Sequence, residues 1–203
     1  MNARTVLLIM SAAIAPTTAS AAVVLDQQQN SDTTNIASFH QTDLAQSFTT
    51  TANNVAGGGV LLENGVGSGG GTVTFGLWTE LPNVGGAVEL ATATATIVSN
   101  DQWLDAFWSP VSVTPGATYY LTFDSASSYG VGGDITNPYP NGNVFANPGY
   151  QSFPAFDYAF RTYTSAGAVP EPSTWAMMAL GFAGLAFAGH PRVRKHQLAT
   201  GAA

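Results

Sequence analysis

The pattern that most constrains the fold is a series of short segments in which apolar and polar residues alternate, with Gly- and Pro-rich turns between them. Alternate side chains of a β-strand point to opposite faces of a sheet, so this period of two predicts strands with one buried face. In residues 117–123, for example, Tyr119, Leu121 and Phe123 share one face. The segments predicted as strands are residues 45–50, 60–62, 72–79, 87–98, 102–108, 117–123 and 157–164.

These segments lie in a region, residues 22–168, that is long enough for one hydrophobic core. The region lacks helical periodicity, and turn signals recur between its short strands. We therefore predict an all-β fold, an antiparallel jelly-roll-like β-sandwich of seven or eight strands.

Charge in this region is scarce and almost entirely acidic. The chain of 203 residues has 5 Lys and Arg against 12 Asp and Glu, and residues 22–168 contain one base, Arg161, and eleven acids. A surface with a net charge of −10 cannot neutralise phosphates, which excludes nucleic-acid binding as a main activity. The absence of Cys excludes disulfides, zinc thiolate sites and thiol catalysis.

The N-terminal residues 1–21 have the pattern of a signal peptide. Arg4 precedes an apolar run of nine residues, which is too short to span a membrane, and Pro16 follows that run. Ala19 and Ala21 supply the small side chains at positions −3 and −1 that signal peptidase accepts. We expect cleavage after Ala21, with Ala22 as the second choice; a buried N-terminal helix of a cytosolic domain is the alternative.

The C-terminal residues 169–203 combine a Pro-rich motif, an apolar run and basic residues. Val169-Pro170-Glu171-Pro172 predicts an extended stub, and the uncharged run 175–189 predicts a transmembrane helix with the preceding domain outside the cell. Fifteen residues rise only about 22 Å, so local thinning of the bilayer or snorkelling of basic side chains would be needed. The predicted anchor consists of Trp175, Met177, Leu180, Phe182, Leu185 and Phe187, and the basic stop of Arg192, Arg194 and Lys195.

The order of these parts resembles the PEP-CTERM protein-sorting segment, in which a Pro-Glu-Pro motif, an apolar helix and a basic cluster follow one another. In some proteins the same segment is labelled the ice-binding protein C-terminal domain. The resemblance implies recognition by a membrane-embedded exosortase and cleavage near Pro170-Glu171-Pro172. It also implies export to the cell surface or extracellular matrix of a Gram-negative bacterium that makes exopolysaccharide. A plain single-pass anchor is the alternative.

Residues 44–164 resemble, in outline, a broad class of bacterial extracellular sandwiches that includes carbohydrate-binding modules. The motifs concerned are mostly those that make the fold, so the likeness assigns no ligand. Exposed aromatic rings stack on sugars. We predict glycan contact by Trp78, Trp108 and Tyr139; the alternative is that these side chains pack in the core. Further candidates are Trp103, Tyr129 and Phe145.

The motifs that resemble catalytic or cofactor-binding sites lack the surrounding sequence that such sites require. The G-x-G-x-x-G run at 65–70 precedes a predicted strand, whereas a dinucleotide site needs a helix there. His40 is the sole His of residues 22–168, and Asp101 and Asp105 would lie about 13 Å apart on a strand, too far for glycoside hydrolysis. The polar loop 134–143 carries oxygen ligands suited to Ca²⁺ but not the spacing of a dedicated calcium loop.

These observations lead to two hypotheses of different classes. The first is an exported, non-enzymatic cell-surface or matrix protein, sorted by an exosortase and associated with exopolysaccharide, without cofactor or metal. The second is a carbohydrate-binding module with an aromatic stacking face and with Ca²⁺ as a candidate ligand. The signal peptidase, the exosortase and the membrane, through the C-terminal helix, are the expected partners.

Overall fold

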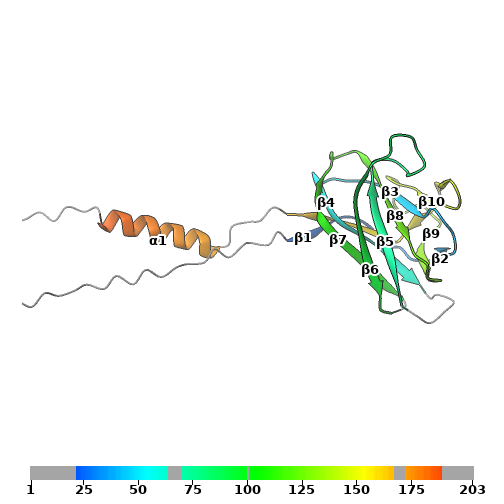
Figure 1. The fold of residues 1–203 in the computed structure, drawn as a ribbon, viewed down its shortest axis with the longest axis horizontal. Coiled ribbons are helices and arrows are strands. Elements are labelled where there is room, and N and C mark those ends of the chain that lie inside the picture. The colour runs from blue at the N-terminus through cyan, green and yellow to red at the C-terminus, as the bar shows by residue number, and fades with distance from the viewer. Residues whose placement is uncertain (1–21, 64–69, 100, 167–171, 189–203) are drawn as a thin grey trace, which may run out of the picture. The chain divides into compact units, whose positions relative to one another are not determined.

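The computed structural model describes residues 22–63, 70–99, 101–166 and 172–188. The chain divides into two compact units, Ala22–Gly167, here called the all-β unit, and the two flanks, Met1–Ala21 with Ala168–Ala203 (Figure 1). The predicted signal peptide, with Ala19 and Ala21, lies outside the described residues. The elements are β1 Val23–Gln29, β2 Thr34–Ser38, β3 Ala45–Thr49, β4 Asn54–Glu63, β5 Gly71–Trp78, β6 Glu89–Ile97, β7 Gln102–Ser112, β8 Thr118–Asp124, β9 Gly130–Asp134, β10 Val144–Ala146, β11 Gln151–Phe153, β12 Asp157–Tyr158, β13 Phe160–Ser165 and α1 Pro172–Ala188.

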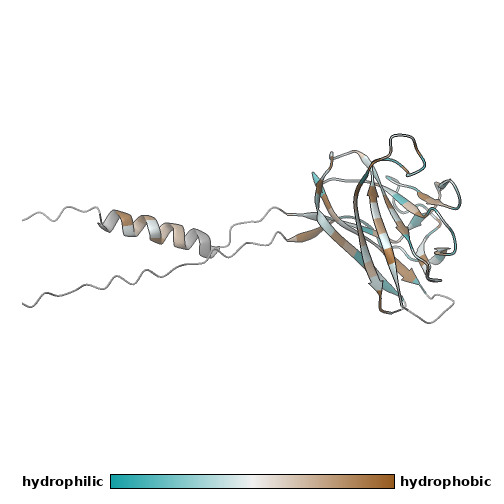
Figure 2. Ribbon diagram, viewed as in Figure 1, coloured by the Kyte–Doolittle hydropathy of each residue, from teal (hydrophilic) through white to brown (hydrophobic). Residues whose placement is uncertain are grey.

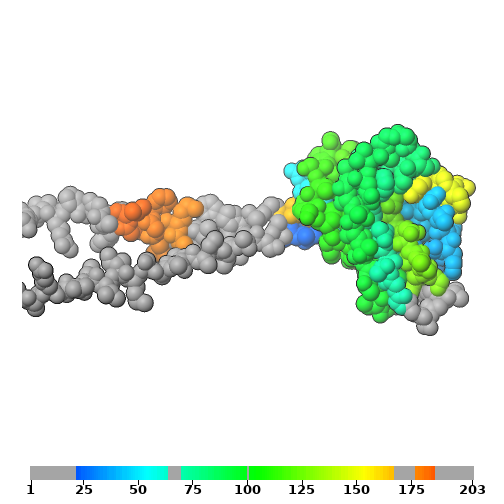
Figure 3. All heavy atoms as spheres, viewed as in Figure 1, coloured from blue at the N-terminus to red at the C-terminus, as the bar shows by residue number. Residues whose placement is uncertain are grey.

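Two antiparallel sheets form the all-β unit, which confirms the predicted all-β sandwich; the jelly-roll order of its strands stays a prediction. One sheet has the order β1-β13-β4-β9-β12, with β7 paired to the other edge of β4 and β2 paired to β9. The second sheet has the order β11-β10-β3-β8-β5-β6. In the space-filling view the green part of the chain, which includes β5, β6 and β7, covers much of the face of this unit that is in view (Figure 3).

The core lies between the two sheets and follows the alternation in the sequence. Tyr119, Leu121 and Phe123 of β8 are buried, as predicted; Phe48 of the neighbouring strand β3 and Phe160 of the opposite sheet are fully buried. Hydrophobic and hydrophilic residues alternate along the strands in Figure 2. Because the described hydrophobic core belongs entirely to the all-β unit, we expect this unit to fold on its own.

The strands exceed the predicted ones where glycine or proline is part of a strand. The described residues contain thirteen strands rather than seven or eight, and β4 includes the run Gly57-Gly58-Gly59, which lies before the predicted strand 60–62. Strand β7 continues past Pro110, because its register to β4 shifts there in a bulge. Pro110 has no N–H, and within the bulge no hydrogen bond to β4 requires one.

The C-terminal flank contains one described helix, α1, of 17 residues. It confirms that this segment is helical but does not confirm that the helix crosses a membrane. No helix of the described residues is long and apolar enough to cross a membrane, which corrects the transmembrane expectation. Seventeen residues rise about 26 Å, less than a hydrocarbon core of about 30 Å. Of the predicted anchor side chains, Met177, Leu180, Phe182 and Leu185 are exposed, whereas those of Trp175 and Phe187 lie outside the described part.

Candidate functional site

The outer face of the β1-β13-β4-β7 region gathers aromatic side chains. On β7, Leu104 and Ala106 point into the core, so Trp103, Asp105 and Phe107 point outward. On β13 the same alternation buries Phe160 and Thr162 and turns Arg161 and Tyr163 outward. The two sets come from segments more than fifty residues apart, and both strands pair with β4.

Strand β4 contributes glycine where these side chains meet. Gly57 pairs with Phe107 on one side and Tyr163 on the other, and Gly59 pairs with Asp105 and Arg161. A Cβ atom at Gly57 would lie 2.7 Å from Phe107 Cδ1, and one at Gly59 would meet Asp105 Oδ1. The missing side chains of β4 therefore allow the side chains of β7 and β13 to contact each other across it.

These contacts define a surface that we name the aromatic patch, and its members are Leu25, Trp103, Asp105, Phe107, Arg161 and Tyr163. The ring centroids of Phe107 and Tyr163 are 5.0 Å apart, with the planes inclined by 54°. Arg161 Cζ lies 3.6 Å from the centroid of the Trp103 ring, and Arg161 Nη1 lies 3.8 Å from Asp105 Oδ2. Leu25 pairs with Tyr163 in the register and is 41% exposed, and Phe107 is 53% exposed.

Partial burial shifts the pKa values of two polar side chains of the patch. Burial raises the pKa of Asp105, while a hydrogen bond with Tyr163 and the charge of Arg161 act in the opposite direction. Burial, followed by the charge of Asp105, raises the pKa of Tyr163. Arg161 is the only Lys or Arg of the described residues, so this face carries the one basic side chain found there.

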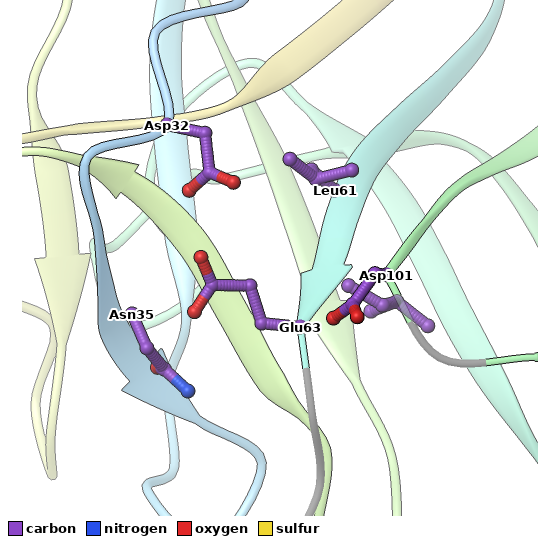
Figure 4. A pocket seen from close by; sticks show the side chains of 6 residues that line it. Asp32, Asn35, Leu61, Glu63 and Asp101 are labelled. Atoms are coloured by element: carbon purple, nitrogen blue, oxygen red, sulfur yellow. The ribbon is translucent and has the colours of Figure 1, made fainter.

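A second feature of the same sheet is an acidic pocket of about 470 Å³, lined by Asp32, Asn35, Leu61, Leu62, Glu63 and Asp101. The carboxylates of Asp32 and Glu63 point toward each other, with Asp101 beside Glu63 (Figure 4). Burial, and then a hydrogen bond and repulsion from Asp32, raise the pKa of Glu63 to about 7. Glu63 therefore exchanges its proton near neutral pH.

The acidic pocket predicts a pH dependence of stability. Because the folded state raises the pKa of Glu63 from 4.5 to about 7, its contribution is fully present below pH 4.5 and is lost as the pH rises through 7. We expect the urea concentration at the unfolding midpoint of the all-β unit to decrease when the pH is raised from 6 to 8. In Glu63→Gln this decrease should be smaller. An equal fall in both proteins would contradict the assignment to Glu63.

The residues weighed for catalysis and metal binding are not brought together. His40 is exposed, Asp101 lines the acidic pocket, and Asp105 belongs to the aromatic patch. In the loop weighed for Ca²⁺, Asp134 Oδ1 accepts hydrogen bonds from Thr136 N (2.7 Å) and Thr136 Oγ1 (2.6 Å), and Oδ2 accepts one from Ser31. Within the described ranges no group of three or more His, Cys, Asp or Glu side chains is arranged to hold a metal.

The three chosen glycan-contact residues occupy separate places. Tyr139 is only 8% exposed, its ring is edge-on to Phe160 and its hydroxyl donates to Gln27 Oε1, so it offers no surface for stacking. Trp108 is half-buried and donates from Nε1 to the carbonyl of Val55 (3.1 Å), and Trp78 is a half-buried residue at the end of β5.

The aromatic patch was only partly visible in the sequence. Trp103 was one of the further candidates, but Phe107, Arg161 and Tyr163 were not. The alternation that places Phe160 and Thr162 inside also places Arg161 and Tyr163 outside, and this complementary face was the available signal. The Gly-rich run at 65–70 lies, except for Gly70, outside the described residues, and β5 follows it as the predicted strand.

The comparison with protein families concerns the C-terminal flank. Residues 168–193 match the model of the PEP-CTERM protein-sorting motif, and no curated protein matches the chain. Of the predicted sorting residues, Val169, Pro170 and Glu171 lie outside the described part, as do Arg192, Arg194 and Lys195, and Pro172 begins α1. The chain thus carries, after the all-β unit in the sequence, the sorting motif of exported proteins that are processed by an exosortase.

Proposed function

We propose that this chain is a non-enzymatic protein of the bacterial cell surface or extracellular matrix, whose all-β unit associates with extracellular polysaccharide. The observation that carries the proposal is the sorting motif at 168–193, which follows a compact all-β unit. In this proposal a signal peptidase removes residues 1–21, and an exosortase processes the segment around Pro170-Glu171-Pro172. The host is a Gram-negative bacterium.

The composition of the all-β unit supports a role outside the cell. The unit lacks Cys, so its fold is independent of the redox state of the compartment. Its acidic residues keep it soluble and repel nucleic acids. Asp101 and Asp105 belong to different surfaces, and His40 is exposed, which supports a binding role rather than catalysis.

Deleting residues 169–195 from the full chain in its native host is expected to remove most of the protein from the surface and matrix fractions. The reason is that the sorting motif would no longer be available to the exosortase. Immunoblots of cell, membrane and matrix fractions measure this. Deletion of residues 197–203, which lie beyond the matched motif, is the control. Unchanged distribution of the 169–195 deletion would refute exosortase sorting.

A second candidate function is a carbohydrate-binding module in the strict sense. The aromatic patch favours it, because exposed rings beside polar donors are the usual means of holding sugars. This candidate shares the polysaccharide association of the first and adds a defined ligand site.

A further inference from the structure

We propose that the aromatic patch binds an uncharged polysaccharide with equatorial linkages, whose flat C–H faces lie on Phe107 and Tyr163 while its hydroxyls accept hydrogen bonds from Arg161. This inference rests on the polysaccharide association proposed above and names its site and ligand class.

The apolar part of the ligand site consists of rings held by the sheet. Phe107 is more than half exposed, and its contact with Tyr163 at 5.0 Å fixes both rings over the glycines of β4. Because the ring planes are inclined by 54°, successive sugars of a twisted chain contact different rings. Leu25 extends this apolar surface beside Tyr163.

The polar part of the site is preorganised beside the rings. Arg161 is stacked on Trp103 and held by Asp105, which reduces the entropy that its side chain loses on binding. A guanidinium has five N–H donors in a fixed plane; Arg161 uses donors toward Asp105, at 3.8 Å, and toward Tyr163, and the proposal assigns the remaining ones to hydroxyl groups of the ligand. Trp103, which supports Arg161, and Phe107 are four residues apart on one strand, about 13 Å. The polar and the apolar contacts with the ligand are therefore spread over more than the width of one sugar.

The charge of the unit selects among polysaccharides. Asp105 compensates the charge of Arg161 within the patch, and the remaining ten acids of residues 22–168 have no other base among them. An anionic polysaccharide would meet repulsion from the unit as a whole and no net attraction at the patch. The face therefore suits a ligand without charge.

Affinity electrophoresis of the all-β unit in native gels tests this inference with a matched pair of polymers. Hydroxyethylcellulose and carboxymethylcellulose share a β-1,4-glucan backbone, and only the second is anionic. We expect retardation by hydroxyethylcellulose and weaker retardation by carboxymethylcellulose. Phe107→Ala and Tyr163→Ala should each lower the affinity for hydroxyethylcellulose by about tenfold, the loss expected for one stacked ring.

The control is Val88→Ala, because Val88 is as exposed as Phe107, at 53%, but lies outside the patch. Thermal unfolding monitors the fold, and Phe107→Leu, which keeps apolar area without a ring, serves if Phe107→Ala does not fold. Failure of hydroxyethylcellulose to retard the unit, stronger retardation by carboxymethylcellulose, or patch variants that bind like the wild type would overturn the inference. A dimer abolished by Phe107→Ala would assign the face to a second copy instead. Matrix fractionation of the 169–195 deletion tests the proposed function separately.

Discussion

The variant Asp157→Ala is expected to lower the free energy of unfolding of the all-β unit by about 3 kcal/mol, because it leaves two buried donors without acceptors. Asp157 is fully buried. Its Oδ2 accepts a hydrogen bond from Tyr139 N (2.8 Å) and its Oδ1 one from Gln46 Nε2 (3.1 Å). These bonds tie β12 to the loop before β10 and to β3, so the loss affects both sheets. Urea denaturation measures the change.

The control for this prediction is Asp157→Asn, which keeps the shape and one acceptor. Burial raises the pKa of Asp157 from 3.8 to about 6, so the part of its contribution to stability that depends on the bound proton is fully present below pH 3.8 and is lost as the pH rises through 6. Asp157→Asn should therefore be less damaging than Asp157→Ala and should lose this pH dependence. Equal urea midpoints for the wild type and Asp157→Ala would show that the network does not stabilise the fold.

The strands that were predictable from the sequence are those whose buried face is made of large apolar side chains. β5 and β8 lie within about one residue of their predicted bounds, because Val73, Phe75 and Leu77, like Leu121 and Phe123, alternate with polar residues. Burial of such side chains dominates the free energy of folding, so the pattern is written directly in the sequence.

The strands that were not predictable depend on neighbours distant in the chain. β9, Gly-Val-Gly-Gly-Asp, has almost no side chains to form a pattern, yet it is buried because β2 and β4 pair with it. β1, which lacks apolar–polar alternation, becomes a strand by pairing with β13, more than a hundred residues away. Such pairings arise from tertiary context, which overrides weak local preference.

The candidate site shows the same division. Aromatic residues were predicted as sugar contacts, but Tyr139 is buried because it packs on Phe160, and no local pattern around Tyr139 encodes this contact. Phe107 and Tyr163 meet only because both strands flank the glycines of β4. The two rings can approach each other because β4 has glycine between them. A glycine adds nothing to the hydrophobic pattern of the sequence, so the contact could not be predicted.

The variant Gly133→Ala is expected to destabilise the all-β unit by about 3 kcal/mol, the upper range for overpacking a well-filled interior. A Cβ atom at Gly133 would overlap the backbone oxygen of Asp157 and would lie 2.6 Å from Ile36 Cδ1. Gly133 pairs with Thr34 on one side and Tyr158 on the other, so neither neighbour can move away without breaking a strand pairing. Urea denaturation at one pH measures the change.

The matched control is Gly85→Ala, the same substitution where a Cβ atom would meet nothing within 4 Å. An exposed position of this kind should change the free energy of unfolding by no more than about 0.5 kcal/mol. The difference between the two variants therefore isolates the steric contribution from the general effect of replacing glycine on the unfolded chain. If Gly133→Ala were as stable as Gly85→Ala, β9 would have to leave its place between β2 and β12 at little cost, and close approach would not be the reason for glycine at this position.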